Sequence, residues 1–459
     1  MKKILASIIT LPLLLAGCGI YTDYTRPALP VVDSLYTHMP VEAVSNDTTS
    51  LAFLSWEELF ADSLLRGYIR MGLEHNTDLN LARLRVEEAE ATLQASRLAF
   101  LPSASLSAEL GASGAQGPSF SVAPSFQWEI DAFGKMRNTK KGAEAALEQS
   151  RAYRQAVQTQ LIATIADSYY ALLMLDQQIE ISRRTMATWE ENIRSLSALK
   201  RAGKTNEAAV LQASANKLQV ENSIYSMQRQ IYEQENAFAA LLGTGPMEIR
   251  RGKLDDQSFP ENLSVGIPLH LLQYRPDVRQ AEYALAESFY AENLARSYFY
   301  PGITLGGSAG WSTSFGTAIG NPAGWLASAL ASLTAPLFDR GTSIARLKIA
   351  RAQQQEALLS FRQTLIDAGT EVNNALAAWQ TAKQRLNVDQ KLILNLQAAV
   401  WNTNLLMKHG LTNYLEVLTA QQTLLSAELS QSSDKYAEIQ SVINLYHALG
   451  GGSGLADDI

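Results

Sequence analysis

Cys18 has the most distinctive chemistry in this 459-residue chain, because it is the only cysteine. A lone cysteine is usually a buried core thiol, but the position of Cys18 favours attachment of a lipid to the sulfur. The residues before it have the three parts of an export signal, namely basic residues, a short apolar run and small residues at a cleavage point: Lys2, Lys3, residues 4–15, Ala16 and Gly17.

The stretch Leu15-Ala16-Gly17-Cys18 is similar to the lipobox of bacterial lipoproteins, in which cleavage makes the cysteine residue one and its sulfur carries lipid. We therefore predict that residues 1–17 are a lipoprotein signal peptide and that Cys18 is the lipidation site. Gly19 follows it, as in lipoproteins that are sorted onward to the outer membrane.

No other group of residues has the spacing of a catalytic or metal site. The chain has no HExxH or GxSxG motif and no glycine-rich loop between a strand and a helix that could hold phosphate. The five histidines are scattered: His38, His75, His270, His409 and His447. The sequence therefore predicts no enzyme activity, no cofactor and no metal site.

Charge and composition exclude further classes of protein. The net charge is −7, and removal of the predicted signal leaves 36 basic against 45 acidic side chains, which does not favour a nucleic-acid partner. A single cysteine allows no intrachain disulfide, so stability must come from packing or assembly. No apolar run of 18 or more residues follows the signal, so if the mature chain crosses a membrane it needs a closed β-barrel.

An internal duplication organises the chain. Seven residues recur after 199 positions: Asp78, Ala82, Glu88, Arg97, Phe100, Pro102 and Leu106 return as Asp277, Ala281, Glu287, Arg296, Phe299, Pro301 and Leu305. Later residues, such as Gly203 and Gly410, recur after 207 positions. We predict an N-terminal segment at 18–55, a first repeat at 56–250, a connector at 251–268, a second repeat at 269–450 and a flexible tail at 451–459.

Each repeat contains two segments of alternating apolar and polar residues. Both lie within about 102–131 in the first repeat and within about 302–337 in the second. Alternation predicts strands with one apolar face, which also fits an ordinary soluble hairpin. Their length of about 10 residues and their small polar side chains favour membrane strands instead. Two hairpins supply only four strands, so several chains must associate to close a barrel.

Long proline-free helical patterns follow the strands, at about 135–200 and 342–408. Each helix would be about 100 Å long at 1.5 Å per residue, and such a rod needs helical partners along its length. Each ends at a turn with glycine where φ is positive and Thr-Asn as the next N-cap. A second long helix then returns, at about 206–242 and 413–449.

This arrangement resembles the TolC-like outer membrane factors, in particular the lipoprotein branch that serves tripartite efflux pumps. The resemblance covers essentially the whole mature chain. It rests on the order of several motifs within a duplicated chain: Cys18 and residues 23–27, 128–134, 272–278, 281–282, 299–301, 336–339 and 410–418.

The resemblance implies a mainly α fold with a membrane β-barrel portion, formed by a homotrimer with a 12-stranded β-barrel continuous with a 12-helix α-barrel. It implies outer membrane lipid, a periplasmic adaptor (membrane fusion) protein and an inner-membrane RND-type pump as partners. It further implies that the adaptor contacts the turns between the long helices: Ala202, Gly203, Lys204, His409, Gly410 and Leu411. The connector and the chain ends would form an equatorial belt.

Glu416 has two possible roles. It lies three residues after Asn413, so it could complete a helix capping box and need no channel function. The resemblance implies a periplasmic gate, in which three symmetry-related carboxylates attract cations and narrow the opening. The family pattern has a second acid one helical turn later, where this chain has Thr419 instead. The loss of that charge would weaken the ring of carboxylates.

We therefore expect an outer membrane exit channel of a tripartite efflux pump in a Gram-negative bacterium, which passively conducts drugs and other small toxic compounds. A metal-ion efflux duct or a type I secretion duct is an alternative within the channel class. A lipid-anchored periplasmic coiled-coil scaffold would also explain the long helices and the lipid, but it predicts no lipid-facing strands.

Overall fold

The computed structural model describes residues 21–27, 54–113, 117–257, 259, 275–314, 325–335 and 339–451. The predicted signal peptide and Cys18 lie outside the described residues. So do most of the N-terminal segment, most of the connector and most of the predicted tail.

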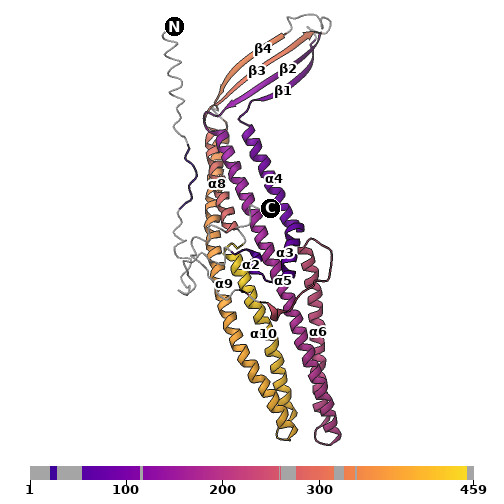
Figure 1. The fold of residues 1–459 in the computed structure, drawn as a ribbon. Coiled ribbons are helices and arrows are strands. Elements are labelled where there is room, and N and C mark those ends of the chain that lie inside the picture. Colours follow the sequence, from indigo (N-terminus) through magenta and orange to yellow (C-terminus); the bar gives the residue numbers. More distant parts are fainter. Residues whose placement is uncertain are drawn as a thin grey trace. The chain divides into compact units, whose positions relative to one another are not determined.

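The same series of elements occurs twice (Figure 1). The first series is α4 (Thr77–Leu98), β1 (Ser103–Ser113), β2 (Gly117–Ile130), α5 (Lys135–Arg201) and α6 (Glu207–Leu241). The second is α8 (Pro276–Ser297), β3 (Gly302–Ser314), β4 (Trp325–Thr334), α9 (Thr342–Lys408) and α10 (Tyr414–Ala448). Equivalent helices have equal lengths of 22, 67 and 35 residues. The predicted duplicated unit of two strands and a long helical hairpin is confirmed.

Three short elements complete the described chain: α2 (Trp56–Leu59), α3 (Ser63–His75) and the 3-10 helix η4 (Leu254–Asp256). Ser55 begins α2 with a complete capping box, in which Glu58 bonds back to the Ser55 backbone. Pro276 is the first residue of α8, with Asp277 in the first turn, as the fixed φ of proline and the helix dipole favour.

The four strands form one antiparallel sheet in the order β1-β2-β3-β4. Its register puts the apolar positions of neighbouring strands opposite each other, since Phe126 pairs with Ala104 and Trp128 with Leu305. Ser105 and Ser125 are opposite each other on the other face, and their hydroxyls lie 2.7 Å apart. One exposed exception is Leu330, which pairs with Gly306 on the polar face.

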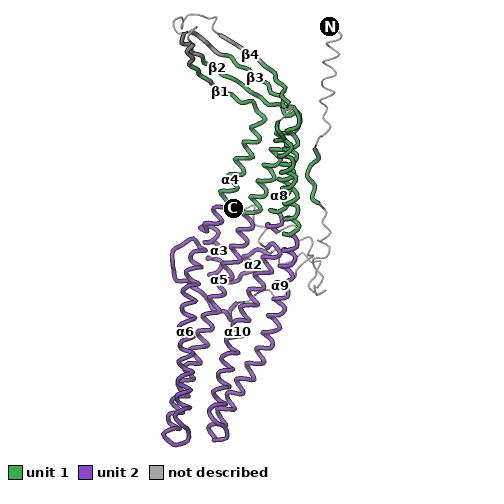
Figure 2. Tube along the Cα trace, turned by 180° about the vertical axis from the view of Figure 1, so that it is seen from behind, with its two compact units in different colours: residues 1–29, 83–153, 279–364 green, residues 30–82, 154–278, 365–459 purple. Residues whose placement is uncertain are grey.

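The chain divides into two compact units that do not coincide with the two repeats (Figure 2). Unit 1 contains residues 1–29, 83–153 and 279–364, and thus the sheet. Unit 2 contains residues 30–82, 154–278 and 365–459, and thus both helical turns. Each unit therefore takes segments from both repeats.

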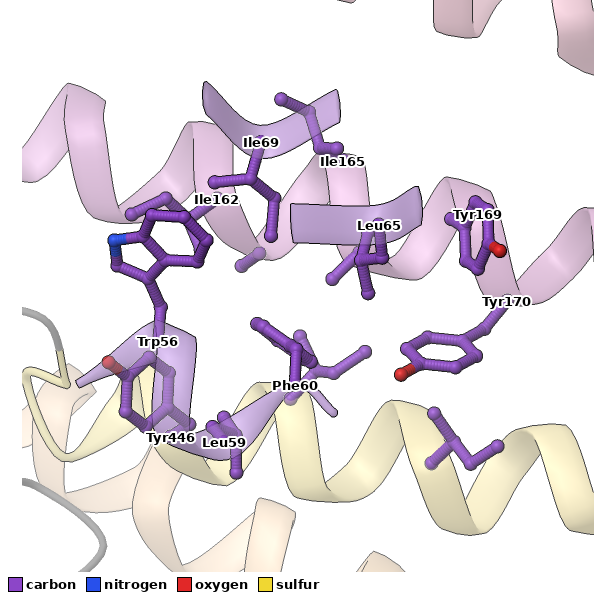
Figure 3. Packing of buried hydrophobic residues seen from close by; sticks show 14 of the residues in the cluster. Trp56, Leu59, Phe60, Leu65, Ile69, Ile162, Ile165, Tyr169, Tyr170 and Tyr446 are labelled. Atoms are coloured by element: carbon purple, nitrogen blue, oxygen red, sulfur yellow. The ribbon is translucent and has the colours of Figure 1, made fainter. Parts of the chain in front are cut away.

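The core of unit 2 gathers side chains from α2, α3, α5 and α10 (Figure 3). Phe60, Leu65, Ile69 and Tyr169 are fully buried there, and Trp56 packs beside them. Burial of one such side chain stabilises a fold by about 2 kcal/mol. This core fastens the short N-terminal helices onto the long helices. Within the described residues, no helix has both the length and the apolarity required to span a bilayer.

Candidate functional site

The turns α5–α6 and α9–α10 have the same backbone geometry. Gly203 and Gly410 have φ values of 70° and 72°, a left-handed conformation that glycine adopts without steric cost. In both turns the glycine N–H donates three residues back, and the next N–H donates five residues back, at 2.9–3.0 Å. This pattern satisfies the last carbonyl groups of α5 and α9 and reverses the chain within a few residues.

The six predicted adaptor-contacting residues are all exposed at these turns: Ala202, Gly203, Lys204, His409, Gly410 and Leu411. The side chains of the two turns differ, because His409 and Leu411 replace Ala202 and Lys204 at equivalent positions. The first turn is also closed by an ion pair between Lys200 and Glu207. The second turn therefore presents more apolar surface.

Asn206 and Asn413 begin the returning helices, and each side chain accepts a backbone N–H three residues later. At the second turn this N–H belongs to Glu416, with an N···O distance of 3.3 Å. The Glu416 carboxylate is exposed and makes no hydrogen bond or ion pair with the described residues. Its side chain does not complete the capping box, in contrast to Glu58.

An apolar cluster next to the turns joins the two hairpins. Trp189 of α5 is 1 % exposed and packs with side chains of α6 and with Leu418 of α10. Tyr414 and Val210 border the same cluster, so the first turns of α6 and α10 lie at the same end of unit 2 (Figure 1). Burial raises the pKa of Tyr414 to about 12, which keeps its phenol neutral. On α10, Glu416 lies between Tyr414 and Leu418, and it faces away from them.

A seam of polar contacts links α10 to α5 along unit 2. Its hydrogen bonds and ion pair measure 2.8–2.9 Å: Tyr436–Asp167, Gln440–Asp167, Ser432–Gln177, Gln178–Ser433, Arg184–Glu428 and Asn192–Gln421. Each pair joins the second repeat to the first across more than 225 residues of sequence. None of these residues is among the site residues predicted from the sequence, because no single position reveals a partner so distant.

A stripe of large side chains along α6 is exposed. Leu211, Leu218, Tyr225 and Tyr232 recur every seven residues and are 60–65 % exposed. Their equivalents on α10, 207 residues later, pack against the first repeat: Leu418, Leu425, Ser432 and Ile439. Three of these are only 3–4 % exposed. Leu211 and Leu218 have leucine at the equivalent positions of α10, so the sequence alone does not show which copy of the stripe is exposed.

The described residues include no cluster of three or more His, Cys, Asp or Glu side chains that could hold a metal ion. Several of their acids pair with cations instead. Arg275, for example, is buried between Asp277 and Glu371 and also donates to the carbonyl of Ala448 at 2.6 Å. This network fastens the start of α8 to the end of α10.

Comparison with known proteins adds a family and a fold. The family model described as outer membrane efflux protein matches residues 68–244 and 268–451, which cover both repeats. The solved structure of the outer-membrane channel OprN superimposes with a TM-score of 0.85 at 26 % identity, and covers 95 % of this chain and 100 % of that one.

Three curated relatives are each 28 % identical to this chain over nearly its whole length. They are the cation efflux system protein CusC of Escherichia coli, the toluene efflux pump outer membrane protein TtgF of Pseudomonas putida and the probable outer membrane lipoprotein SilC of Salmonella typhimurium. The matches cover 96 %, 97 % and 98 % of this chain and 97 %, 96 % and 99 % of the relatives, respectively.

Proposed function

Because this chain belongs to the outer membrane efflux protein family, we propose that it is the outer membrane exit channel of a tripartite efflux pump. It conducts small toxic molecules passively from the periplasm to the exterior and catalyses no reaction. The observation that carries this proposal is the combination of a sheet with one exposed apolar face, to which each repeat contributes two strands, and a long helical hairpin in each repeat.

The proposed channel is a homotrimer. The α10 stripe packs against α5 within one chain, whereas the equivalent α6 stripe has no such cover in the described residues. Pseudo-symmetry assigns that cover to α9 of a sister chain, on which Val388, Leu394 and Trp401 are exposed. Such a contact is head-to-tail and forms a ring when the rotation closes. Three chains supply twelve strands and twelve long helices.

The sheet lies in the outer membrane in this proposal. Leu106, Phe126 and Trp128 are exposed on its apolar face, which fits contact with hydrocarbon. Serines predominate on the opposite face, which fits a water-filled lumen. Strands β1 and β4 are the edges of the sheet in one chain, and pairing with sister chains would satisfy their backbone groups.

The turns at Gly203 and Gly410 are the proposed docking site of a periplasmic adaptor, which connects the channel to an inner-membrane RND-type pump. Their exposure and their position at the same end of unit 2 support this assignment. Glu416 is the proposed gate residue, because its carboxylate is exposed beside the second turn without a partner among the described residues. Lipid on Cys18 strengthens attachment by about 0.8 kcal/mol per buried CH₂.

Cation efflux is a second candidate for the cargo. CusC, named as a cation efflux protein, and TtgF, named for toluene efflux, are equally similar to this chain at 28 % identity. Sequence similarity therefore does not distinguish metal ions from organic molecules. Susceptibility of a deletion strain to organic toxicants and to metal salts distinguishes them, since only loss of the true cargo route lowers tolerance.

Reconstitution tests the channel itself. The full-length lipidated protein should assemble as a trimer and give stepwise ionic conductance in planar bilayers. A Cys18→Ala variant should stay in the membrane fraction, because the strands hold it there. A water-soluble monomer without conductance would refute the proposal and favour a lipid-tethered scaffold.

A further inference from the structure

We propose that Arg137, Arg296 and Tyr300, which we call the junction cluster, bind the phosphate headgroup of an anionic phospholipid at the periplasmic rim of the sheet. The inference rests on the proposed function, which places the sheet in the outer membrane. It adds a specific lipid partner, and all its residues belong to unit 1.

The junction between strands and helices has the composition of a membrane interface. Leu101, Trp128 and Phe299 are exposed there. The Trp128 indole N–H donates to the carbonyl of Phe100 at 2.9 Å. Tyr300 stacks on Phe133 with ring centroids 5.2 Å apart. Aromatic side chains of this kind collect at the level of lipid headgroups, because their rings are apolar and their edges can be hydrated.

Tyr21 lies at the junction between β2 and α5. A Cβ atom built on Gly134 would lie only 3.1 Å from the Tyr21 ring, so the ring covers the start of α5. Burial raises the pKa of Tyr21, as do Tyr300 and Asp131, while the positive charges of Arg296 and Arg137 lower it. The stack of Phe133 on Tyr300 joins the start of α5, which carries Arg137, to the end of α8, which carries Arg296.

The proposed lipidation site is near Tyr21 in sequence. Cys18 precedes Tyr21 by three residues, and three residues of chain span at most about 11 Å. In the proposed function, a lipid on that sulfur would therefore be attached within this reach of Tyr21, whose ring covers the start of α5. The headgroups of neighbouring phospholipids lie at the same level.

Positive charge exceeds negative charge at the cluster. Glu292 Oε1 accepts from both Arg296 and Arg351, at 2.6 and 3.2 Å, so one carboxylate serves two guanidinium groups. Asp131 accepts the backbone N–H groups of Met136 and Arg137 as well as the Arg137 side chain. The side chains of Arg137 and Arg296 remain 63 % and 46 % exposed.

A phosphate oxyanion fits this arrangement. Arginine presents several N–H donors in a planar fork that matches a phosphate group. The exposed guanidinium groups of Arg137 and Arg296 therefore favour a phosphate partner. The excess of cations occurs in a chain with a net charge of −7, so overall charge does not explain it. Anionic phospholipid supplies both the phosphate and acyl chains for the adjacent apolar strand ends.

The test uses the full-length lipidated protein in nanodiscs of phosphatidylcholine containing a minority of phosphatidylglycerol. Enrichment of phosphatidylglycerol in the bound lipid is measured by native mass spectrometry. The double variant Arg137→Gln/Arg296→Gln should reduce enrichment by about fivefold for each cation removed. The control Arg362→Gln/Lys391→Gln removes two exposed cations elsewhere on α9 and should leave enrichment unchanged.

Conductance in pure phosphatidylcholine separates this inference from the proposed function. Channel activity in pure phosphatidylcholine, together with no enrichment of phosphatidylglycerol in the mixed nanodiscs, overturns the lipid site at the junction cluster but not the proposed channel. Absence of conductance in every bilayer overturns the proposed function itself. Equal losses of enrichment in the double variant and in the control also contradict the inference.

Discussion

Tyr436 of α10 donates its phenolic O–H to Asp167 of α5 at 2.9 Å, although 269 residues separate them in sequence. Gln440 donates to the same carboxylate oxygen at 2.9 Å. The contact is part of the seam that holds the helices of the second repeat against those of the first. Four experiments on the seam, the stripe, the second turn and the Arg275 network follow from the geometry.

Removal of the Tyr436 hydroxyl should loosen the seam. Tyr436→Phe keeps the ring but loses one hydrogen bond to a carboxylate. This loss should lower the free energy of unfolding by about 1.5–3 kcal/mol. The channel should spend more time open in single-channel recordings. Tyr153→Phe is the control, because it keeps the ring that lies under the Arg85 guanidinium, and its hydroxyl makes no hydrogen bond with the described residues. An unchanged open probability in Tyr436→Phe would exclude the seam from gating.

Charge on the exposed α6 stripe should prevent assembly. Leu218→Asp would bury a carboxylate in the proposed interface between chains, at a cost of several kcal/mol. Light scattering after size-exclusion chromatography should then report monomers. Leu218→Met keeps the apolar volume and should leave trimers intact. Trimers of Leu218→Asp with wild-type stability would show that this stripe faces something other than a sister chain.

The cap and gate roles at the second turn can be separated. Asn413→Ala removes the oxygen that accepts the Glu416 N–H, and should lower stability by about 1 kcal/mol without altering ion selectivity. Glu416→Gln retains that N–H and removes only an exposed charge. It should leave the melting temperature unchanged and reduce the preference for cations, measured as a reversal potential in a salt gradient. The opposite pair of results would make Glu416 a structural cap.

Acid should weaken the network around Glu371. Burial raises the pKa of this carboxyl, but hydrogen bonds and charge from His447 and Arg275 outweigh burial and lower the pKa to about 2. The ionised form therefore favours the folded chain above the pKa of about 4.3 that glutamate has when unfolded. This contribution disappears as the pH falls from about 4.5 towards 2. Thermal melts should show a flatter acid dependence in Glu371→Gln, and an identical dependence would contradict the assignment.

The sequence by itself determined the local structure of each repeat. Strand alternation, the proline that begins α8, and the glycine and asparagine at each turn act over a few residues, so their effects can be recognised without knowing distant partners. The duplication determined the equal lengths of the paired helices. Motif order was also sufficient to predict the family that the family model then matched.

Only the tertiary structure decided how the two repeats combine. Both compact units draw on both repeats, and the seam from Asp167 to Gln421 joins residues that no local pattern relates. The structure also decided that Leu418 is buried while its equivalent, Leu211, is exposed. The physical reason is that burial depends on which surfaces meet. Duplicated segments have the same helical periodicity, but their surroundings differ. Within one chain, α10 packs against α5, whereas no described segment covers the equivalent stripe of α6.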